Sequence, residues 1–370
     1  MIIYISTLVV LLLFSFLELR VNLTTIQQYK MLAFVYVIFV LQVGLRWETG
    51  TDWVPYLNHF EETNSTSDLS YTLTGFEIGY NYFVLTIKTL WNNYSVFLVS
   101  HALIYYFLIF SSLKKFTPYI FVCIMLFYAT TLGYLGSSRQ LLAMGICLYA
   151  LRYVLDKQAL KFFALIGIAF LFHTTAILFC VYYFLNRDIK PIIIFSVLVA
   201  SIIIGKTSIP FTMFSFVGES LGGMVISKVS VYIERFQDME NSGLTTVGFI
   251  KRLIFLSVFL FNYKALSEKL SYYKLIFNGY FFGLLIYFLF SSSLLIMVNR
   301  GSLYFNIMES LLIASQFLLF NNKQYRFIPL IILFIISVFL LLQSISPYPD
   351  LFHPYKGIFI NVDLQRFRLS

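Results

Sequence analysis

Residues 327–346 read FIPLIILFIISVFLLLQSIS and contain no charged side chain. A helix of this length measures about 30 Å, which is the thickness of the hydrocarbon core of a bilayer. The rest of the chain has the same character, because 59% of its 370 residues are hydrophobic and only 12% are charged. A soluble protein carries roughly twice that share of charge. The predicted fold class is therefore an all-α polytopic membrane protein.

Further apolar runs recur on both sides of the chain's midpoint, and each is long enough to be read as a span. They lie near residues 2–17, 31–45, 96–113, 119–135, 141–155, 191–205, 248–263, 276–297 and 303–320. Segments 76–91 and 160–185 are ambiguous. We expect about 10–12 transmembrane helices in one integral membrane domain, residues 1–370, with outer loops at 46–75 and 206–247.

Basic residues gather in six of the connecting segments, and cytoplasmic loops are the ones enriched in Lys and Arg. These residues are Arg20 and Lys30; Lys114 and Lys115; Arg152, Lys157 and Lys161; Arg187 and Lys190; Lys264, Lys269 and Lys274; and Lys323 and Arg326. All six face the cytoplasm if 76–91 stays at the outer surface and 160–185 forms a helical hairpin turning near His173. A single long helix over 160–185 is the alternative, and it would invert everything that follows.

On that topology three informative stretches lie on the outer face. They are the loop Arg46–Thr74, the turn Gly133–Gln140 and the long segment Lys206–Arg252. In the third stretch the spacing of Val225, Val229, Ile233 and Phe236 predicts a short amphipathic helix that ends near Arg235. The tail 347–370 is expected to fold back across the outer mouth.

Isolated arginines stand at the ends of the apolar runs: Arg46, Arg139, Arg235 and Arg300. An unpaired guanidinium is costly in a bilayer protein, so each needs a partner or a function. Its planar fork of donors suits phosphate. The pattern therefore favours an anionic, phosphate-bearing substrate.

Five short motifs in this order resemble the EpsG branch of the Wzy-like polysaccharide polymerases. They are Arg46-Trp47-Glu48-Thr49-Gly50-Thr51-Asp52-Trp53 with Tyr56, Glu77-Ile78-Gly79-Tyr80, Ser138-Arg139-Gln140 with Ala143, Phe172-His173, and Arg300 with Tyr304-Phe305. The resemblance covers nearly the whole chain and is least clear over 206–252. It implies a metal-independent membrane glycosyltransferase of the GT-C kind, an O-antigen or exopolysaccharide polymerase.

The resemblance further implies a multi-pass protein of the bacterial cytoplasmic (inner) membrane whose active site faces the periplasm or exterior. Its substrate would be an undecaprenyl-pyrophosphate-linked oligosaccharide, with membrane lipid and a chain-length regulator as the other candidate partners. No cofactor and no nucleic acid are expected.

Candidate roles follow from the chemistry, in which a leaving pyrophosphate is stabilised and an acceptor hydroxyl loses its proton. The catalytic candidates are Asp52, His173 and Arg139, with either Asp52 or His173 as the base. Arg139 and Arg300 are expected to hold the pyrophosphate. The substrate-binding candidates are Arg46, Glu77, Tyr80, Arg235, Arg252, Arg300 and Tyr304. No metal site is expected, since there is no DxD motif, and Cys123, Cys147 and Cys180 lack CxxC spacing.

Structural explanations compete with each role. Arg139 could snorkel at a helix start, Arg46 could pair with Glu48 or Asp52, and Glu77 could favour a helix dipole. Arg252 could be an interfacial anchor. Among whole functions, a lipid-linked oligosaccharide flippase or transporter, a glycan ligase and a membrane acyltransferase remain open.

Overall fold

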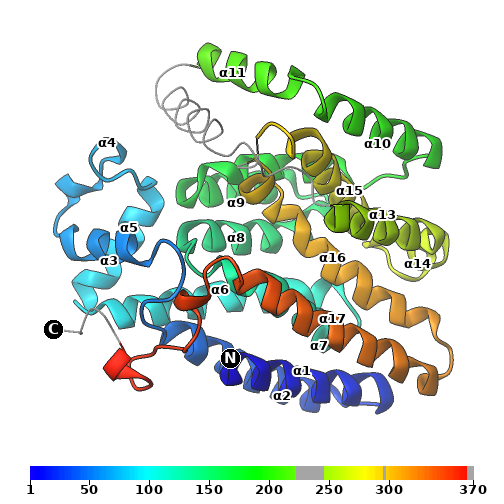
Figure 1. Ribbon diagram of the computed structural model, residues 1–370, viewed down its shortest axis with the longest axis horizontal. Helices are drawn as coiled ribbons and strands as arrows, with labels where there is room; N and C mark the ends of the chain where they lie inside the picture. Colours follow the sequence, from blue (N-terminus) through cyan, green and yellow to red (C-terminus); the bar gives the residue numbers. More distant parts are fainter. Residues whose placement is uncertain (222–245, 295–296, 365–370) are drawn as a thin grey trace. The chain divides into compact units, whose positions relative to one another are not determined.

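The computed structural model describes residues 1–221, 246–294 and 297–364, and these residues form helices and contain no strand (Figure 1). The all-α fold class is thereby confirmed. The chain divides into two compact units, one made of Met1–Cys180 with Ile313–Ser370 and the other of Val181–Leu312. Five described helices are long and apolar enough to cross a membrane, judged by length and composition: Ile2–Arg20, Thr25–Gly44, Tyr94–Phe116, Tyr273–Phe290 and Lys323–Ile345.

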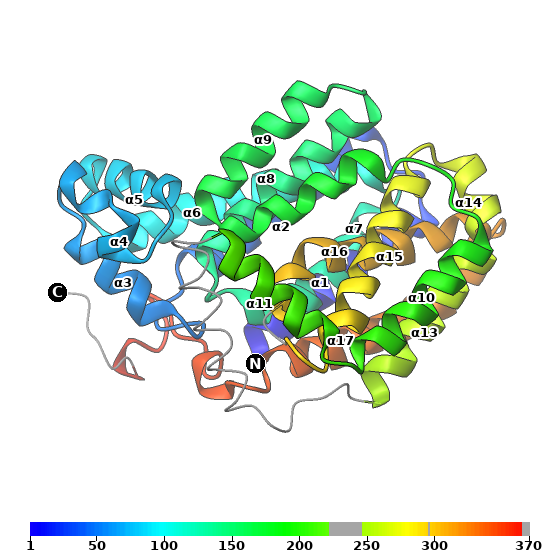
Figure 2. The same cartoon turned by 90° about the horizontal axis from the view of Figure 1, so that it is seen from above.

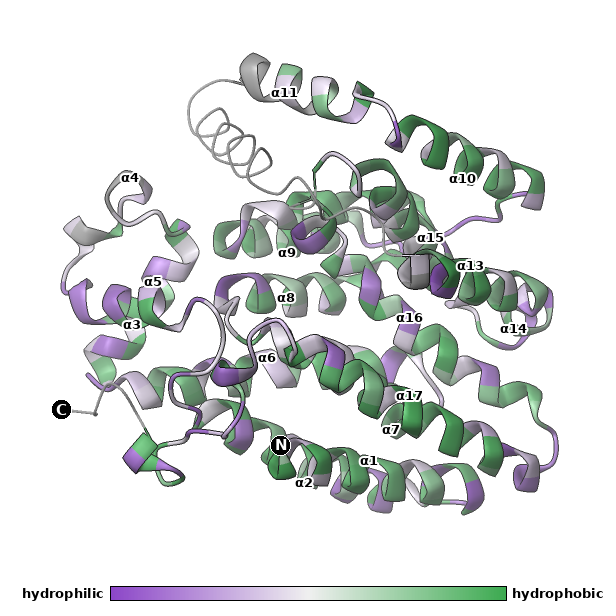
Figure 3. Cartoon of the chain, in the orientation of Figure 1, coloured by the Kyte–Doolittle hydropathy of each residue, from purple (hydrophilic) through white to green (hydrophobic). Residues whose placement is uncertain are grey.

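The first unit is built from long helices that pack side by side. They are α1 (Ile2–Arg20), α2 (Thr25–Gly44), α6 (Tyr94–Phe116), α7 (Ile120–Thr131), which continues into η2 (Leu132–Tyr134), α8 (Ser138–Leu155), α9 (Ala159–Phe172) and α17 (Phe327–Ile345), which η6 (Lys323–Arg326) precedes. Helix α1 packs on α7 and α17, α2 on α6, and α8 on both α6 and α9. Figure 3 shows apolar residues along the length of these helices, as expected of helices that contact lipid.

The starts of α2 and α7 are fixed by side chains that satisfy the first backbone N–H groups. Thr24 and Gln27 form a reciprocal capping box at the start of α2. Helix α7 is capped from another helix, because Glu18 of α1 accepts hydrogen bonds from the N–H groups of Ile120 (2.8 Å) and Phe121 (3.0 Å). The negative charge of a carboxylate at this position also interacts favourably with the positive end of the helix dipole.

The ambiguous segment 160–185 is not one long helix. Helix α9 ends at Phe172, His173 adopts an extended backbone (φ −157°, ψ 122°), and the 3₁₀ helix η3 (Thr174–Phe184) follows. The break lies at the residue where the hairpin was predicted to turn.

Short helices cluster at the end of the first unit where α2 stops and α8 begins (Figures 1 and 2). They are α3 (Trp53–Glu62), η1 (Thr66–Leu69), α4 (Tyr71–Thr74) and α5 (Ile78–Leu90). Helix α5 covers the second ambiguous segment and is about 20 Å long, too short to span the hydrocarbon core. This agrees with the prediction that 76–91 does not cross.

The C-terminal tail, with η7 (Pro349–Leu351) and η8 (Val362–Leu364), folds back onto the residues that follow α2. The Trp47 N–H donates to the Lys356 carbonyl (2.8 Å) and the Ile358 N–H to the Leu45 carbonyl (3.0 Å). The Tyr355 hydroxyl donates to the carbonyl of Gln42 (2.8 Å). The tail thus folds back, as predicted, through backbone and side-chain hydrogen bonds, and that it covers an outer mouth stays a prediction.

The second unit surrounds α15 (Tyr273–Phe290), on which α10 (Pro191–Gly205), α11 (Ile209–Leu221) and α13 (Thr246–Phe261) pack. It also holds α14 (Tyr263–Lys269), η4 (Met297–Gly301) and the start of α16 (Leu303–Gln316), which runs on into η5 (Phe317–Leu319). The predicted outer loop 206–247 is partly helical, since α11 lies within it. The predicted amphipathic helix and Arg235 lie outside the described residues.

Candidate functional site

The loop after α2 and the turn before α8 are packed backbone against backbone. A Cβ atom on Gly136 would lie 2.6 Å from the Thr51 nitrogen and 3.0 Å from the Asp52 nitrogen. On the opposite side of this contact Gly50 has φ +93°, a conformation that favours glycine. Only glycine fits at these two positions, and the fit brings the first and third predicted motifs together.

Arg139, in the first turn of α8, is held at two of its three guanidinium nitrogens. Its Nη1 donates to Glu77 Oε2 (2.5 Å) and to the carbonyl of Gly75 (3.2 Å), and its Nε donates to the Tyr56 hydroxyl (3.3 Å). The group also lies 4.4 Å from the ring centroid of Phe76. Its Nη2 makes no hydrogen bond to any residue that the structure describes, and the side chain is 20% exposed. Nε and Nη1 are therefore fixed, while Nη2 can donate a hydrogen bond to a ligand.

Glu77 connects this arginine to the break in the α9–η3 segment. Its carboxylate is 7% exposed, and Oε1 accepts the N–H of Thr174 (3.4 Å). The preceding residue, His173, is buried, and its Nδ1 lies 2.6 Å from the Thr175 hydroxyl and accepts the Thr175 N–H (3.4 Å). An Nδ1 that accepts an N–H leaves the proton of the neutral ring on Nε2.

Asp52 lies immediately before α3, and its half-buried carboxylate forms no hydrogen bond or ion pair within the described parts of the chain. Tyr56 lies one helical turn after Asp52, and burial raises the pKa of its hydroxyl. The positive charge of Arg139 opposes that rise and the negative charge of Asp52 adds to it. Asp52 and Arg139 thus act electrostatically on the same hydroxyl.

Arg46 is 4% exposed and serves as a brace between chain segments. Its Nη1 donates to the carbonyl of Val43 (2.5 Å), in the last turn of α2, and its Nη2 to the carbonyl of Leu135 (3.2 Å). The expected alternative pairing with Glu48 does not occur, because Glu48 pairs with Lys356 of the tail (2.9 Å). Among the described residues Arg46 has no acidic partner, and it lines a cavity of about 10 Å³, the space of one water.

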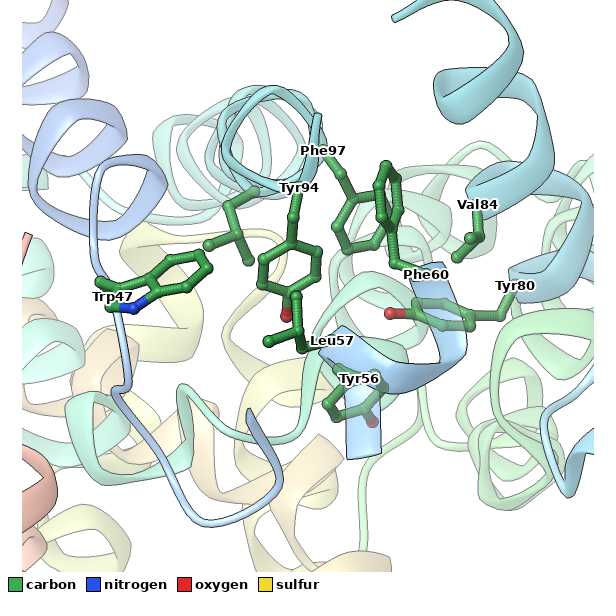
Figure 4. Close-up of a cluster of buried hydrophobic side chains, with 9 residues drawn as sticks. Trp47, Tyr56, Leu57, Phe60, Tyr80, Val84, Tyr94 and Phe97 are labelled. Atoms are coloured by element: carbon green, nitrogen blue, oxygen red, sulfur yellow. The ribbon is translucent and has the colours of Figure 1, made fainter. Parts of the chain in front are cut away.

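An aromatic core packs against these polar groups and joins α3 and α5 to α6 (Figure 4). It comprises Trp47, Tyr56, Leu57, Phe60, Tyr80, Val84, Tyr94, Phe97 and Leu98. Tyr80, a predicted substrate contact, is completely buried in this core. The Tyr80 side chain therefore packs within the core next to the site and does not line the site.

The second unit holds three further candidates. Arg252 donates to the carbonyl of Gly248 (3.0 Å) and lies 3.5 Å from the ring centroid of Tyr287. Tyr304 is fully buried, and Arg300 is half-buried in the π-helical turn η4. A substrate role for these residues stays a prediction, as it does for Arg235.

Sequence reasoning missed two features. Tyr56 is the hydrogen-bond partner of Arg139, although the sequence placed it only within the first motif and did not predict this contact. Glu309 of α16 forms an ion pair with Lys251 of α13 (2.9 Å) inside the second unit. The signal for Glu309 was present, because a lone carboxylate within an apolar run usually marks a paired or functional group.

Comparison with known proteins gives one match. The model of the EpsG family matches residues 29–356, which include the Arg46 loop, Glu77, Arg139 and His173. No curated protein and no solved structure gives a significant match. Because the match covers most of the chain, the protein belongs to the EpsG family, a family of Wzy-like polysaccharide polymerases.

Proposed function

We propose that this protein is a metal-independent GT-C-type glycosyltransferase that polymerises lipid-linked oligosaccharide repeat units. The growing glycan would pass from undecaprenyl pyrophosphate to an incoming lipid-linked unit at the outer face of the bacterial inner membrane. The observation that carries the proposal is the Arg139 guanidinium, whose Nη1 and Nε are fixed by Glu77 and Tyr56 while its Nη2 has no described partner.

The leaving group requires positive charge at the moment the glycosidic bond to the pyrophosphate breaks. Arg139 supplies a permanent charge whose orientation is already set by Glu77, so little reorganisation is needed as negative charge develops. The N-terminal end of α8, where Arg139 lies, adds backbone N–H groups and a favourable helix dipole. Family membership and this geometry together support pyrophosphate as the group bound here.

The acceptor hydroxyl attacks the anomeric carbon, forming one C–O bond as the bond to the pyrophosphate oxygen breaks, and its proton passes to a base. Of the two candidate bases we favour Asp52, because its carboxylate is not engaged by any described residue. His173 already uses Nδ1 to accept the Thr175 N–H. We assign His173 and Thr174 the role of positioning Glu77, and through it Arg139.

Deleting the gene tests this function directly through the glycan that remains. If the protein is a polymerase, we expect the deletion strain to carry lipid with a single repeat unit at its surface. No repeat unit outside the membrane would indicate a flippase instead, and a full-length polymer lacking a decoration would indicate an acyltransferase. Normal polymer that stays on its lipid carrier would indicate a ligase.

Complementation with Asp52→Asn tests the assigned base. We expect the single-unit phenotype to persist in this variant although the protein accumulates in the membrane. Asp156→Asn is the matched control, since Asp156 is exposed at the other end of α8. Full polymer from the Asp52→Asn variant would exclude Asp52 as the base.

A further inference from the structure

A second cavity lies within the first unit between α2, α6 and α8, with a volume of about 610 Å³. Lys114 and Arg152 line it, and they belong to the last turns of α6 and α8. The candidate site at Arg139 lies at the opposite end of α8. From Tyr29, which also lines the cavity, to Arg46 the distance along α2 is about 25 Å.

The walls are apolar stripes on two antiparallel helices. On α2 the lining residues Tyr29, Ala33 and Tyr36 recur at helical spacing, as Phe107 and Phe110 do on α6. Tyr29 is 55% exposed and Phe107 is 60% exposed, so the groove opens to the surface of the unit. A groove with this composition on a membrane protein has room for a hydrocarbon chain.

Cations close one end of the groove, and the described residues provide no acid to neutralise them. The ammonium of Lys114 is buried 3.0 Å from the Tyr29 ring centroid and makes no hydrogen bond to the described chain. Arg152 stacks 3.6 Å from the Tyr149 ring centroid and donates Nη2 to the Ser111 hydroxyl (3.0 Å).

Lys115 lines the cavity beside these two groups. None of the three cations forms an ion pair with a residue in the described ranges. A buried ammonium without a hydrogen-bond acceptor is costly, which points to an anionic ligand that supplies one.

We propose that this cavity binds an anionic phospholipid, with its phosphodiester on Lys114, Lys115 and Arg152 and one acyl chain in the groove of α2 and α6. Basic pockets between transmembrane helices bind such headgroups in this way. The charges alone would accept inorganic phosphate, but the aromatic walls favour a ligand with a hydrocarbon chain. The inference does not depend on the proposed polymerase activity.

Native mass spectrometry of the full-length protein in detergent tests the proposal, with phosphatidylglycerol, phosphatidylcholine and inorganic phosphate titrated separately. We expect one tightly bound phosphatidylglycerol. The double variant Lys114→Gln/Arg152→Gln should weaken it roughly 30-fold, from the loss of two cations. Lys30→Gln is the matched control, because Lys30 is exposed near the same end of α2 and does not line the cavity.

Ala33→Trp provides a second, independent variant that keeps all three cations. Ala33 is exposed in the groove, so the indole would occupy the acyl-chain position without disturbing the core. We expect it to exclude phosphatidylglycerol while the thermal stability of the lipid-free protein is unchanged. Equal binding of phosphatidylcholine, equal binding of inorganic phosphate, or undiminished phosphatidylglycerol binding by both variants would each overturn the proposal.

Discussion

Replacing Arg139 by lysine separates charge from geometry at the candidate site. Lysine can keep the ion pair with Glu77, but it has no Nε–H for the Tyr56 hydroxyl and no Nη2 for a ligand. A hydrogen bond to a charged group is worth about 1.5–3 kcal/mol. If Nη2 contributes one such bond to the leaving pyrophosphate in the transition state, kcat/KM should fall roughly 10- to 150-fold.

The assay is polymerisation by the purified full-length protein in lipid nanodiscs, followed as the growth of a glycan ladder from lipid-linked repeat units. Arg20→Lys is the matched control, since Arg20 is exposed at the end of α1, and it should polymerise at the wild-type rate. The thermal unfolding midpoint of Arg139→Lys should fall by no more than the loss of the hydrogen bond to Tyr56 explains, so the variant stays folded at the assay temperature. A normal rate with Arg139→Lys would refute the reasoning, because charge alone would then suffice.

Three further predictions concern stability and are read from thermal unfolding. Gly136→Ala places a Cβ against the loop backbone and should cost about 1–3 kcal/mol, whereas Gly167→Ala, whose Cβ meets nothing, should be neutral or slightly stabilising; equal losses would contradict the packing argument. Burial lowers the pKa of His59 to about 4, so the folded state holds the ring neutral. The contribution of His59 to stability should be complete above pH 6.5 and be lost between about pH 6.5 and 4, so His59→Gln should reduce the slope of stability against pH in that range. Lys356→Met leaves the buried Glu48 carboxylate without its ion pair and should cost about 3–5 kcal/mol, whereas adding Glu48→Gln should recover most of the loss; additive losses would exclude the pair.

The helical architecture was readable from the sequence because one physical requirement dominates it. In lipid each backbone polar group must be satisfied within its own segment, so uncharged runs of sufficient length become helices. The runs near 2–17, 96–113 and 327–346 accordingly coincide with α1, α6 and α17. The break at His173 was also predicted, since the basic loops on either side had to face the same way.

The partners of the arginines were not readable, because they depend on contacts between distant segments. Nothing local shows that Glu77 and Tyr56 hold Arg139, or that Arg46 donates to main-chain carbonyls instead of to a nearby acid. Carbonyl acceptors leave no trace in side-chain patterns. The sequence therefore placed Arg46 and Arg139 at helix ends, as the structure does, but could not distinguish Arg46, which braces the loop, from Arg139, which keeps a donor free.

Docking of the tail imposes an order on the assembly of the molecule. The residues that follow α2 form backbone hydrogen bonds with Lys356 and Ile358, which are synthesised long after α8. The nascent chain therefore contains every catalytic candidate of the first unit before these hydrogen bonds can form. The loop beside the candidate site therefore reaches its final contacts only after residues 355–358 have been made, and a chain that stops before them lacks these hydrogen bonds.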